Sequence, residues 1–384
     1  MNLETSDRKQ FCVMLCIAFF IYSSTQMIGT TIAPYADNLG ATTQYIGIIT
    51  GSFGLMALLP RPISGQIVDK ENNKLLMFLV LLACVASCAI LLFAKTPVFL
   101  LLSRASYGLA WGVGSTLCLT NACNCLSERD MLKGISIYTM AQTLAMVLGP
   151  SLALWLKNLG GYSLLYSVCT ILMLAAFCLV FLFKPKNLGR QDMRYSVQLR
   201  DMFEPTVLAP AALSICTSMI NSTTLAFIVL CAAERDAGEI GWFFTVQALM
   251  ILVFRPVLSR FITQKHLVKV ALIANLILIV YLVVVSVAKT SAAFGAAAIL
   301  IGVSMAASQP SIFNLCVSAV PAERRGCATN TNYAATDVGS FLGPWLSGIL
   351  VGIVGYKGVF LLMALPLLVV VFACARYYHR KKIL

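Results

Sequence analysis

Charged side chains are scarce in this chain of 384 residues. Asp, Glu, Lys and Arg make up 11% of it, whereas a soluble globular protein carries about 25% of them. Hydrophobic residues make up 59%, and the mean hydropathy is +0.87. This leaves too little polar side chain to cover the surface of a water-soluble fold. The composition therefore excludes a soluble protein and predicts that lipid surrounds most of the chain.

Histidine, paired cysteine motifs and phosphate-binding loops are also missing or rare. Only His266 and His379 are present, both in polar segments, and no nucleophile motif accompanies them. No glycine-rich loop of the kind that cradles phosphates occurs. The 14 cysteines form neither a CxxC pair nor a cluster with histidine, so we interpret them as small buried hydrophobes. We expect neither an enzyme nor an ATP-driven pump, and no cofactor, metal site or disulfide framework.

Apolar runs long enough to cross a bilayer recur along the whole chain. A spanning helix needs about 20 apolar residues. We predict an all-α integral membrane protein of twelve transmembrane helices, with a six-helix bundle in residues 1–183, a cytoplasmic linker in 184–206 and a second bundle in 207–384. The predicted spans are 11–36, 43–64, 74–94, 98–120, 134–156, 162–183, 207–231, 239–259, 268–288, 292–318, 327–352 and 357–376.

The distribution of Lys and Arg predicts the orientation. With the N-terminus inside, and with residues at the ends of a span counted with the adjoining segment, 20 of these residues fall on inner segments, 5 on outer loops and 3 within spans. Cytoplasmic loops are enriched in Lys and Arg, so both termini are expected in the cytoplasm. The protein itself is expected in the inner membrane of the cell. The same bias accounts for the formal charge of +13 without a nucleic-acid partner.

The two predicted bundles carry matching landmarks. A shift of 194 residues brings Ile46-Gly47 onto Ile240-Gly241, Gly149-Pro150 onto Gly343-Pro344 and Gly161-Tyr162 onto Gly355-Tyr356. Because each half has an even number of predicted spans, the halves are expected to be parallel repeats. That arrangement is typical of transporters that bind substrate between the halves near the bilayer midplane and alternate access by rocking.

Two segments of the first half match signatures of a known family. The loop after the second span reads Gly65-Gln66-Ile67-Val68-Asp69-Lys70-Glu71-Asn72-Asn73-Lys74, similar to G-x-L-A-D-R-x-G-R-K. The fourth span contains Arg104-Ala105-Ser106-Tyr107-Gly108, similar to R-x-x-Q-G. The chain thus resembles the major facilitator superfamily. The resemblance implies that Gly65, Asp69, Lys70 and Lys74 form a latch at the inner gate and that Arg104 takes part in proton transfer.

Glycine-proline pairs recur in the fifth and eleventh spans. The stretch from Ala145 to Pro150 resembles the G-x-x-x-G-P motif of the drug:proton antiporter branch, and Gly339 to Pro344 matches it with both glycines. Proline removes a backbone hydrogen bond and kinks a helix, while glycine permits close packing. We therefore predict a bent, tightly packed seam made by Gly149, Pro150, Gly339, Gly343 and Pro344.

Asp337 is the one acidic residue well inside a predicted span. A carboxylate at bilayer depth costs several kcal/mol unless it is paired, protonated or facing water. One interpretation makes Asp337 the proton-coupling acid, and the other makes it a structural partner that caps backbone or pairs with an arginine. Arg104 likewise has a functional and a structural interpretation. It either takes part in proton transfer or forms hydrogen bonds to carbonyl groups of neighbouring helices.

Further polar side chains lie in the predicted spans. Arg61 and Arg255 occupy equivalent places near the inner mouth, where they either extend to the headgroups or attract an anionic substrate. An apolar pocket with a few such polar groups suits amphipathic organic solutes. The candidates for its lining are Gln26, Arg61, Tyr107, Gln142, Asn221, Gln247, Arg255 and Asn332.

Three functions remain open at this stage. The leading hypothesis is a monomeric, proton-driven exporter of small amphipathic organic compounds. The alternative is a proton-coupled or exchange importer of an organic anion, favoured by three arginines against one acid in the spans. A receptor or structural protein is the third, and the gate and antiporter signatures argue against it.

Overall fold

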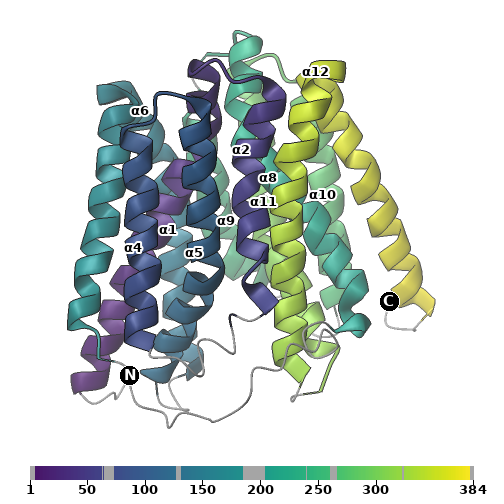
Figure 1. Cartoon of the computed structure of the whole chain (residues 1–384). Helices are drawn as coiled ribbons and strands as arrows, with labels where there is room; N and C mark the ends of the chain where they lie inside the picture. Colours follow the sequence, from purple (N-terminus) through teal and green to yellow (C-terminus); the bar gives the residue numbers. More distant parts are fainter. Residues whose placement is uncertain are drawn as a thin grey trace. The chain divides into compact units, whose positions relative to one another are not determined.

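The chain is almost entirely helical in the computed structural model, which describes residues 5–62, 64, 73–126, 131–184, 204–238, 240–259, 266–321 and 324–380. Figure 1 shows the helices, and within these residues no strand occurs. The first half of the sequence contains α1 (Thr5–Asn38), α2 (Thr43–Leu58), α4 (Asn73–Leu92), α5 (Pro97–Asn124) and α6 (Met131–Leu182). The remaining elements are the short 3-10 helix η1 (Pro205–Val207), α8 (Leu208–Glu234), α9 (Trp242–Ser259), α10 (Leu267–Val287), α11 (Ser291–Ser318) and α12 (Arg325–Arg380).

The two longest helices, α6 and α12, are each interrupted at a glycine. Gly161 has φ 71° and ψ −170°, and Gly355 has φ 66° and ψ 175°. This backbone region is essentially restricted to glycine. A Cβ atom added at either position would meet nothing within 4 Å, so conformation rather than space requires glycine here. The pair Gly161-Tyr162 and its repeat Gly355-Tyr356 thus mark corresponding breaks between two helical segments.

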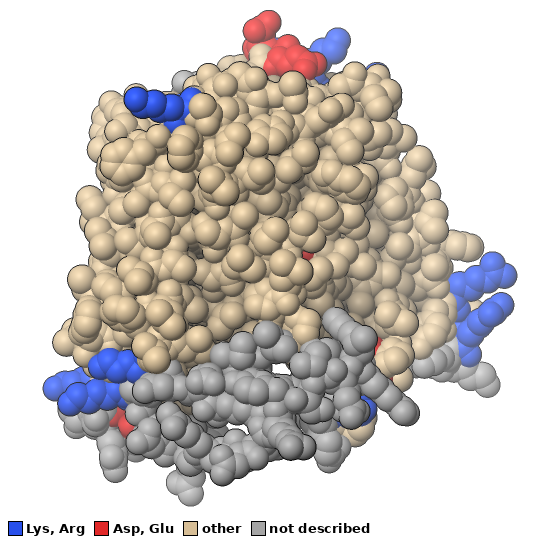
Figure 2. All heavy atoms as spheres, in the orientation of Figure 1, with Lys and Arg blue, Asp and Glu red and all other residues tan. Residues whose placement is uncertain are grey.

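Helix length and apolarity agree with a membrane protein. Seven of the described helices are long and apolar enough to cross a bilayer, and Thr43–Leu58 and Trp242–Leu258 are shorter apolar helices. The predicted total of twelve crossings stays a prediction. On the face shown in Figure 2, charged side chains gather toward the upper and lower edges of the view, and the band between them is covered by uncharged side chains apart from one small acidic spot.

The chain forms two compact units, one made of Met1–Leu39 and Leu55–Val197 and the other of Gly40–Gly54 and Gln198–Leu384. In the first unit α1 packs on α6, and α4 packs on α5 and α6. In the second unit α8 packs on α12, and α10 packs on α11 and α12. The same helix pairing therefore occurs twice, as the shift of 194 residues suggests. The predicted bundle boundaries at 183 and 207 stay a prediction.

The second predicted span is interrupted in the structure. The prediction runs from 43 to 64, whereas α2 ends at Leu58, a turn occupies Leu59-Pro60, and Arg61, Pro62 and Ser64 are helical again. Pro60 has no N–H to donate, and a proline disfavours helical conformation in the residue before it. All but the last four residues of α2 fall within Gly40–Gly54, which belongs to the second compact unit.

Candidate functional site

Arg104 and Tyr107 lie one turn apart on α5 and are buried, with exposed fractions of 6% and 1%. The hydroxyl of Tyr107 is 2.8 Å from Thr25 Oγ1 on α1. Tyr166 on α6 lies close enough to Arg104 to interact with it electrostatically, and its hydroxyl is 3.4 Å from Thr31 Oγ1. The predicted proton-transfer arginine thus sits in a polar cluster that joins α5 to α1 and α6.

The two arginines predicted at the inner mouth are placed differently. Arg61 is buried, and its Nη1 donates to Ser115 Oγ at 3.1 Å and to Thr116 Oγ1 at 3.5 Å on α5. Arg255 on α9 is half-buried. Arg61 therefore stabilises the packing of its segment against α5, whereas Arg255 keeps part of its side chain at the surface.

Gly149 and Gly343 stand where two helices approach each other closely. A Cβ atom at Gly149 would lie 2.8 Å from Gln26 Cβ on α1. A Cβ atom at Gly343 would collide with the backbone carbonyl of Met219 on α8, and would lie 2.5 Å from Ser222 Oγ. Gly343 and Met219 are 194 and 193 residues beyond Gly149 and Gln26. The close approach is therefore the same in both units.

A row of serines on α8 faces the glycine-containing stretch of α12. Ser214 Oγ donates to Asn332 Oδ1 at 2.6 Å. Ser218 Oγ donates to the Thr336 carbonyl at 2.7 Å and lies 2.9 Å from Ser340 Oγ. Gly339 permits this approach, since a Cβ atom there would collide with the carbonyl of Ile215 and lie 2.8 Å from Ser218 Cβ. Close helix packing thus brings hydroxyl groups into a seam within the second unit.

Asp337 lies on α12 beside this seam and is 7% exposed. One and two turns further along α12 are Phe341 and Trp345, whose rings stack with centroids 5.4 Å apart. A buried carboxylate and two aromatic rings therefore follow one another at intervals of four residues, which places them on one face of the helix.

Three glycines of α2 pack against α12, a contact that is not among the sequence predictions. Gly54 lies so close to α12 that a Cβ atom added at this position would be 2.8 Å from the Asp337 carbonyl oxygen and 2.8 Å from the Phe341 backbone nitrogen. Gly51 approaches the Phe341 carbonyl, and Gly47 approaches Gly348. Their spacing of four and three residues is the available signal, since it aligns small residues on one helix face.

The remaining sequence-predicted residues are distributed over several helices. Asn332 is buried and accepts the bond from Ser214, whereas Gln26, Gln142, Asn221 and Gln247 are half-buried. Pro150 and Pro344 are buried within α6 and α12. Lys74 lies in the first turn of α4, and its Nζ donates to the Phe181 carbonyl at 3.3 Å. Gly65, Asp69 and Lys70 lie outside the described residues.

An ion pair at the start of the second unit was missed from the sequence. Glu204 is 5% exposed and pairs with Arg324. It also accepts hydrogen bonds from Thr206 N at 3.3 Å and Thr206 Oγ1 at 2.8 Å, and its own N–H donates to Thr331 Oγ1 at 2.9 Å. Glu204-Pro205-Thr206 is a recognisable helix start, with an acceptor before proline. The predicted linker of 184–206 includes these three residues.

Glu204→Gln is expected to lower the thermal unfolding temperature at neutral pH. The hydrogen bonds from Thr206, and then the pairing with Arg324, lower the pKa of the Glu204 carboxyl from its usual value of 4.5. A lowered folded-state pKa stabilises the fold at pH values above the unfolded-state pKa, and this contribution is lost as the pH falls through the folded-state pKa. The difference in Tm between the parent and the variant should therefore be largest near pH 7 and shrink below about pH 4.5. Glu234→Gln, at an exposed end of α8, is the control. A Tm difference independent of pH would contradict the expectation.

The cysteines show no sign of a metal site. All 14 are free thiols, and the described residues contain no group of three His, Cys, Asp or Glu side chains that could hold a metal ion. Nine of the 14 are buried. They pack as small apolar side chains, as the sequence indicates.

The sequence is similar to a known protein family and to two transport proteins of known name. Residues 14–228 and 210–383 match the model of the Major Facilitator Superfamily. The staphylopine export protein of Staphylococcus aureus is 21% identical over 379 residues, which cover 94% of each chain. The purine ribonucleoside efflux pump NepI of Salmonella paratyphi B is 22% identical over 174 residues, covering 45% of this chain and 43% of the pump.

Solved structures show the same fold at low sequence identity. The nucleoside transporter NupG superposes with a TM-score of 0.78 and 16% identity, over 98% of this chain and 99% of that one. A POT family transporter in complex with 5-aminolevulinic acid superposes with a TM-score of 0.82 and 12% identity, over 98% and 96%.

Proposed function

Because the chain belongs to the Major Facilitator Superfamily, and is therefore a multi-pass membrane transporter and not an enzyme, we propose that it exports small amphipathic organic compounds in exchange for protons. Export is supported by the relative named as an export protein, which aligns over 94% of both chains. Proton coupling is supported by Asp337, a carboxyl group with 7% exposure on a membrane helix. Asp337 is the single observation on which the coupling proposal rests.

The proposed coupling uses the change in charge of Asp337. When protonated, the carboxyl group is neutral and its burial costs little, and when ionised it requires water or a cation. Alternating access would expose the group to one side of the membrane and then to the other, so that a proton bound on one side is released on the other. Phe341 and Trp345 lie on the same face of α12, where they offer apolar surface to an organic substrate.

The topology belongs to the same proposal. The chain crosses the inner membrane twelve times as a monomer, with both termini in the cytoplasm. The bias of Lys and Arg toward one set of loops supports the orientation. The breaks at Gly161 and Gly355 support the division of α6 and of α12 into two crossings each.

Import of a small organic anion is the second candidate. Three arginines support it, since Arg61 and Arg104 are buried and Arg255 is half-buried within apolar helices. An intramembrane arginine marks a substrate or ion pathway by default. One of the three already makes contacts that explain it structurally, since Arg61 donates hydrogen bonds to hydroxyls of α5. Arg104 lies within electrostatic range of Tyr107 and Tyr166.

Transport by purified protein in sealed vesicles separates the two candidates. A panel of amphipathic cations, neutral compounds and organic anions is loaded on one side, and a pH gradient is imposed in either direction. Exchange predicts that substrate moves against the proton gradient, toward the acidic compartment. Movement of anions with protons, toward the alkaline compartment, would favour the importer. No pH dependence for any compound would remove proton coupling from the proposal.

Asp69→Asn is expected to open the inner gate more readily. By family resemblance, Asp69 holds the gate closed through its charge, and the substitution removes this charge with little change in volume. Exposed native cysteines such as Cys12, Cys16 and Cys178 are first replaced, and a single thiol is then introduced at the inner end of a helix. Its labelling rate should rise in the Asn variant, while Glu71→Gln, two residues further along the sequence, leaves it unchanged. Equal labelling and equal transport in the parent and Asp69→Asn would refute the latch.

A further inference from the structure

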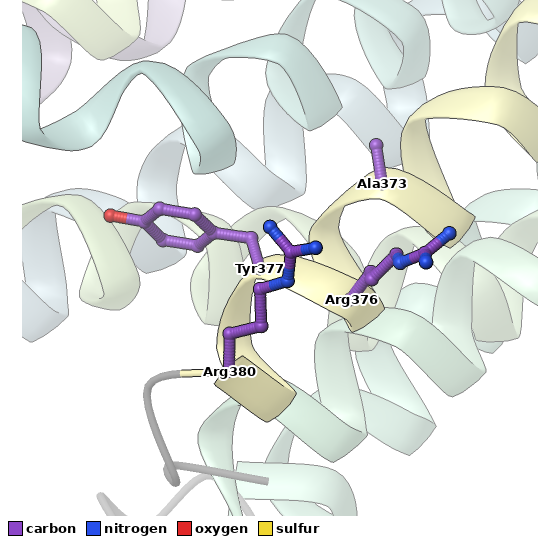
Figure 3. A pocket seen from close by; sticks show the side chains of 4 residues that line it. All are labelled: Ala373, Arg376, Tyr377 and Arg380. Atoms are coloured by element: carbon purple, nitrogen blue, oxygen red, sulfur yellow. The ribbon is translucent and has the colours of Figure 1, made fainter.

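An open hollow of about 610 Å³ lies at the carboxyl end of α12, lined by Ala373, Arg376, Tyr377 and Arg380. The spacing of three, one and three residues places all four on one helix face, and all four side chains are exposed. Figure 3 shows the Arg380 side chain running back along the helix to the level of Arg376, while the ring of Tyr377 points to the side. Two guanidinium groups thus border one surface.

The hollow has a strong positive charge. Neither Arg376 nor Arg380 makes a hydrogen bond or ion pair with another described residue. No acidic residue follows Asp337 in the sequence, whereas Lys381 and Lys382 come directly after Arg380. Guanidinium groups are planar, weakly hydrated donors that bind phosphate through two parallel hydrogen bonds. The chemistry of the hollow therefore suits a phosphate group.

The same helix face continues as apolar surface toward the middle of α12. Leu365 is 56% exposed, Val369 67% and Phe372 65%. These residues precede the arginines at helical spacing, within the segment Cys327–Arg380 that is apolar enough to cross a membrane. A ligand lying along this face would meet hydrocarbon side chains for about two turns and cations at one end.

We propose that this face of α12 binds an anionic membrane phospholipid, with the phosphate between Arg376 and Arg380 and the acyl chains along Leu365, Val369 and Phe372. A soluble phosphate would use only the cationic end and leave the apolar stripe without a role. Cations at a helix C-terminus also interact favourably with the helix dipole, but this effect does not distinguish one phospholipid from another. Selectivity for the headgroup is therefore the property that tests the site.

The test titrates the delipidated full-length protein in detergent with phosphatidylglycerol or phosphatidylcholine of identical acyl chains, and counts bound lipids by native mass spectrometry. Each arginine near the headgroup is expected to contribute about fivefold in affinity. Arg376→Gln and Arg380→Gln should each weaken phosphatidylglycerol binding by about that factor, and the double variant by about twenty-five-fold, with phosphatidylcholine binding unchanged. Lys269→Gln, an exposed cation in the first turn of α10, should leave both affinities as they are.

Three results would overturn the proposal. Equal binding of the two lipids to the parent protein would show that no headgroup is selected. Phosphatidylglycerol binding that is unchanged in the double variant, or weakened as much by Lys269→Gln, would place the lipid elsewhere. Displacement of the lipid by inorganic phosphate at millimolar concentration would assign the hollow to a soluble anion. The single variants keep the test decisive if the double variant does not fold, because each predicts its own partial loss.

Discussion

Asp337→Asn is expected to reduce pH-gradient-driven transport to the level of vesicles without protein, while substrate binding and substrate exchange persist. The asparagine keeps the shape of the protonated acid but has no ionisable oxygen, so it cannot release a proton. Because Asp337 is 7% exposed, its ionised form is the costly state inside a membrane helix. Transport of the panel compounds with and without a pH gradient measures the effect.

The control is Asp37→Asn, which removes an exposed acid at the end of α1 and should leave gradient-driven transport intact. If the Asp337→Asn protein fails to fold, as judged by its elution and thermal unfolding in detergent, the carboxylate is a structural partner. If the folded variant transports at the full rate under a gradient, Asp337 has no part in coupling. The export proposal would then rest on the relatives alone.

Gly343→Ala is expected to lower the free energy of unfolding by about 1–3 kcal/mol, the usual cost of overpacking a tight interface. The added methyl group would collide with the backbone carbonyl of Met219, and backbone cannot rotate away as a flexible side chain can. The helices α8 and α12 must therefore move apart, which also disturbs the bonds from Ser218 to Thr336 and Ser340. Thermal unfolding in detergent, together with gradient-driven transport, reports both effects.

The same helix offers a matched control at Gly352. A Cβ atom there would meet nothing closer than Thr43 Oγ1 at 3.9 Å. Gly352→Ala should therefore leave stability unchanged or raise it by up to about 1 kcal/mol, the helix propensity of alanine over glycine. Gly149→Ala, whose nearest neighbour is Gln26 Cβ at 2.8 Å, should fall between the two. Equal unfolding temperatures for Gly343→Ala and Gly352→Ala would contradict the close packing of α8 on α12.

Several features of this protein could be determined from its sequence. Scarce charge and long apolar runs require helices in lipid, because only such helices close their backbone hydrogen bonds internally in a membrane. The family was recognisable from the loop beginning at Gly65 and from Arg104. The repeated Gly161-Tyr162 and Gly355-Tyr356 predicted corresponding positions in two halves, and both glycines have the positive φ angle that breaks a long helix.

The tertiary structure decided which side of each helix meets a neighbour. A helix that is apolar all round carries little periodicity, so the sequence could not separate the buried Arg61 from the half-buried Arg255. The same limit hid the glycine face of α2, since Gly47, Gly51 and Gly54 have meaning only once α12 lies against them. Glu204 and Arg324 are 120 residues apart and become partners only through the folding of the second unit. Composition and local motifs predict helices in lipid and the family, because both can be recognised along the sequence. The pairings of distant residues could not be predicted, because only folding brings those residues close together.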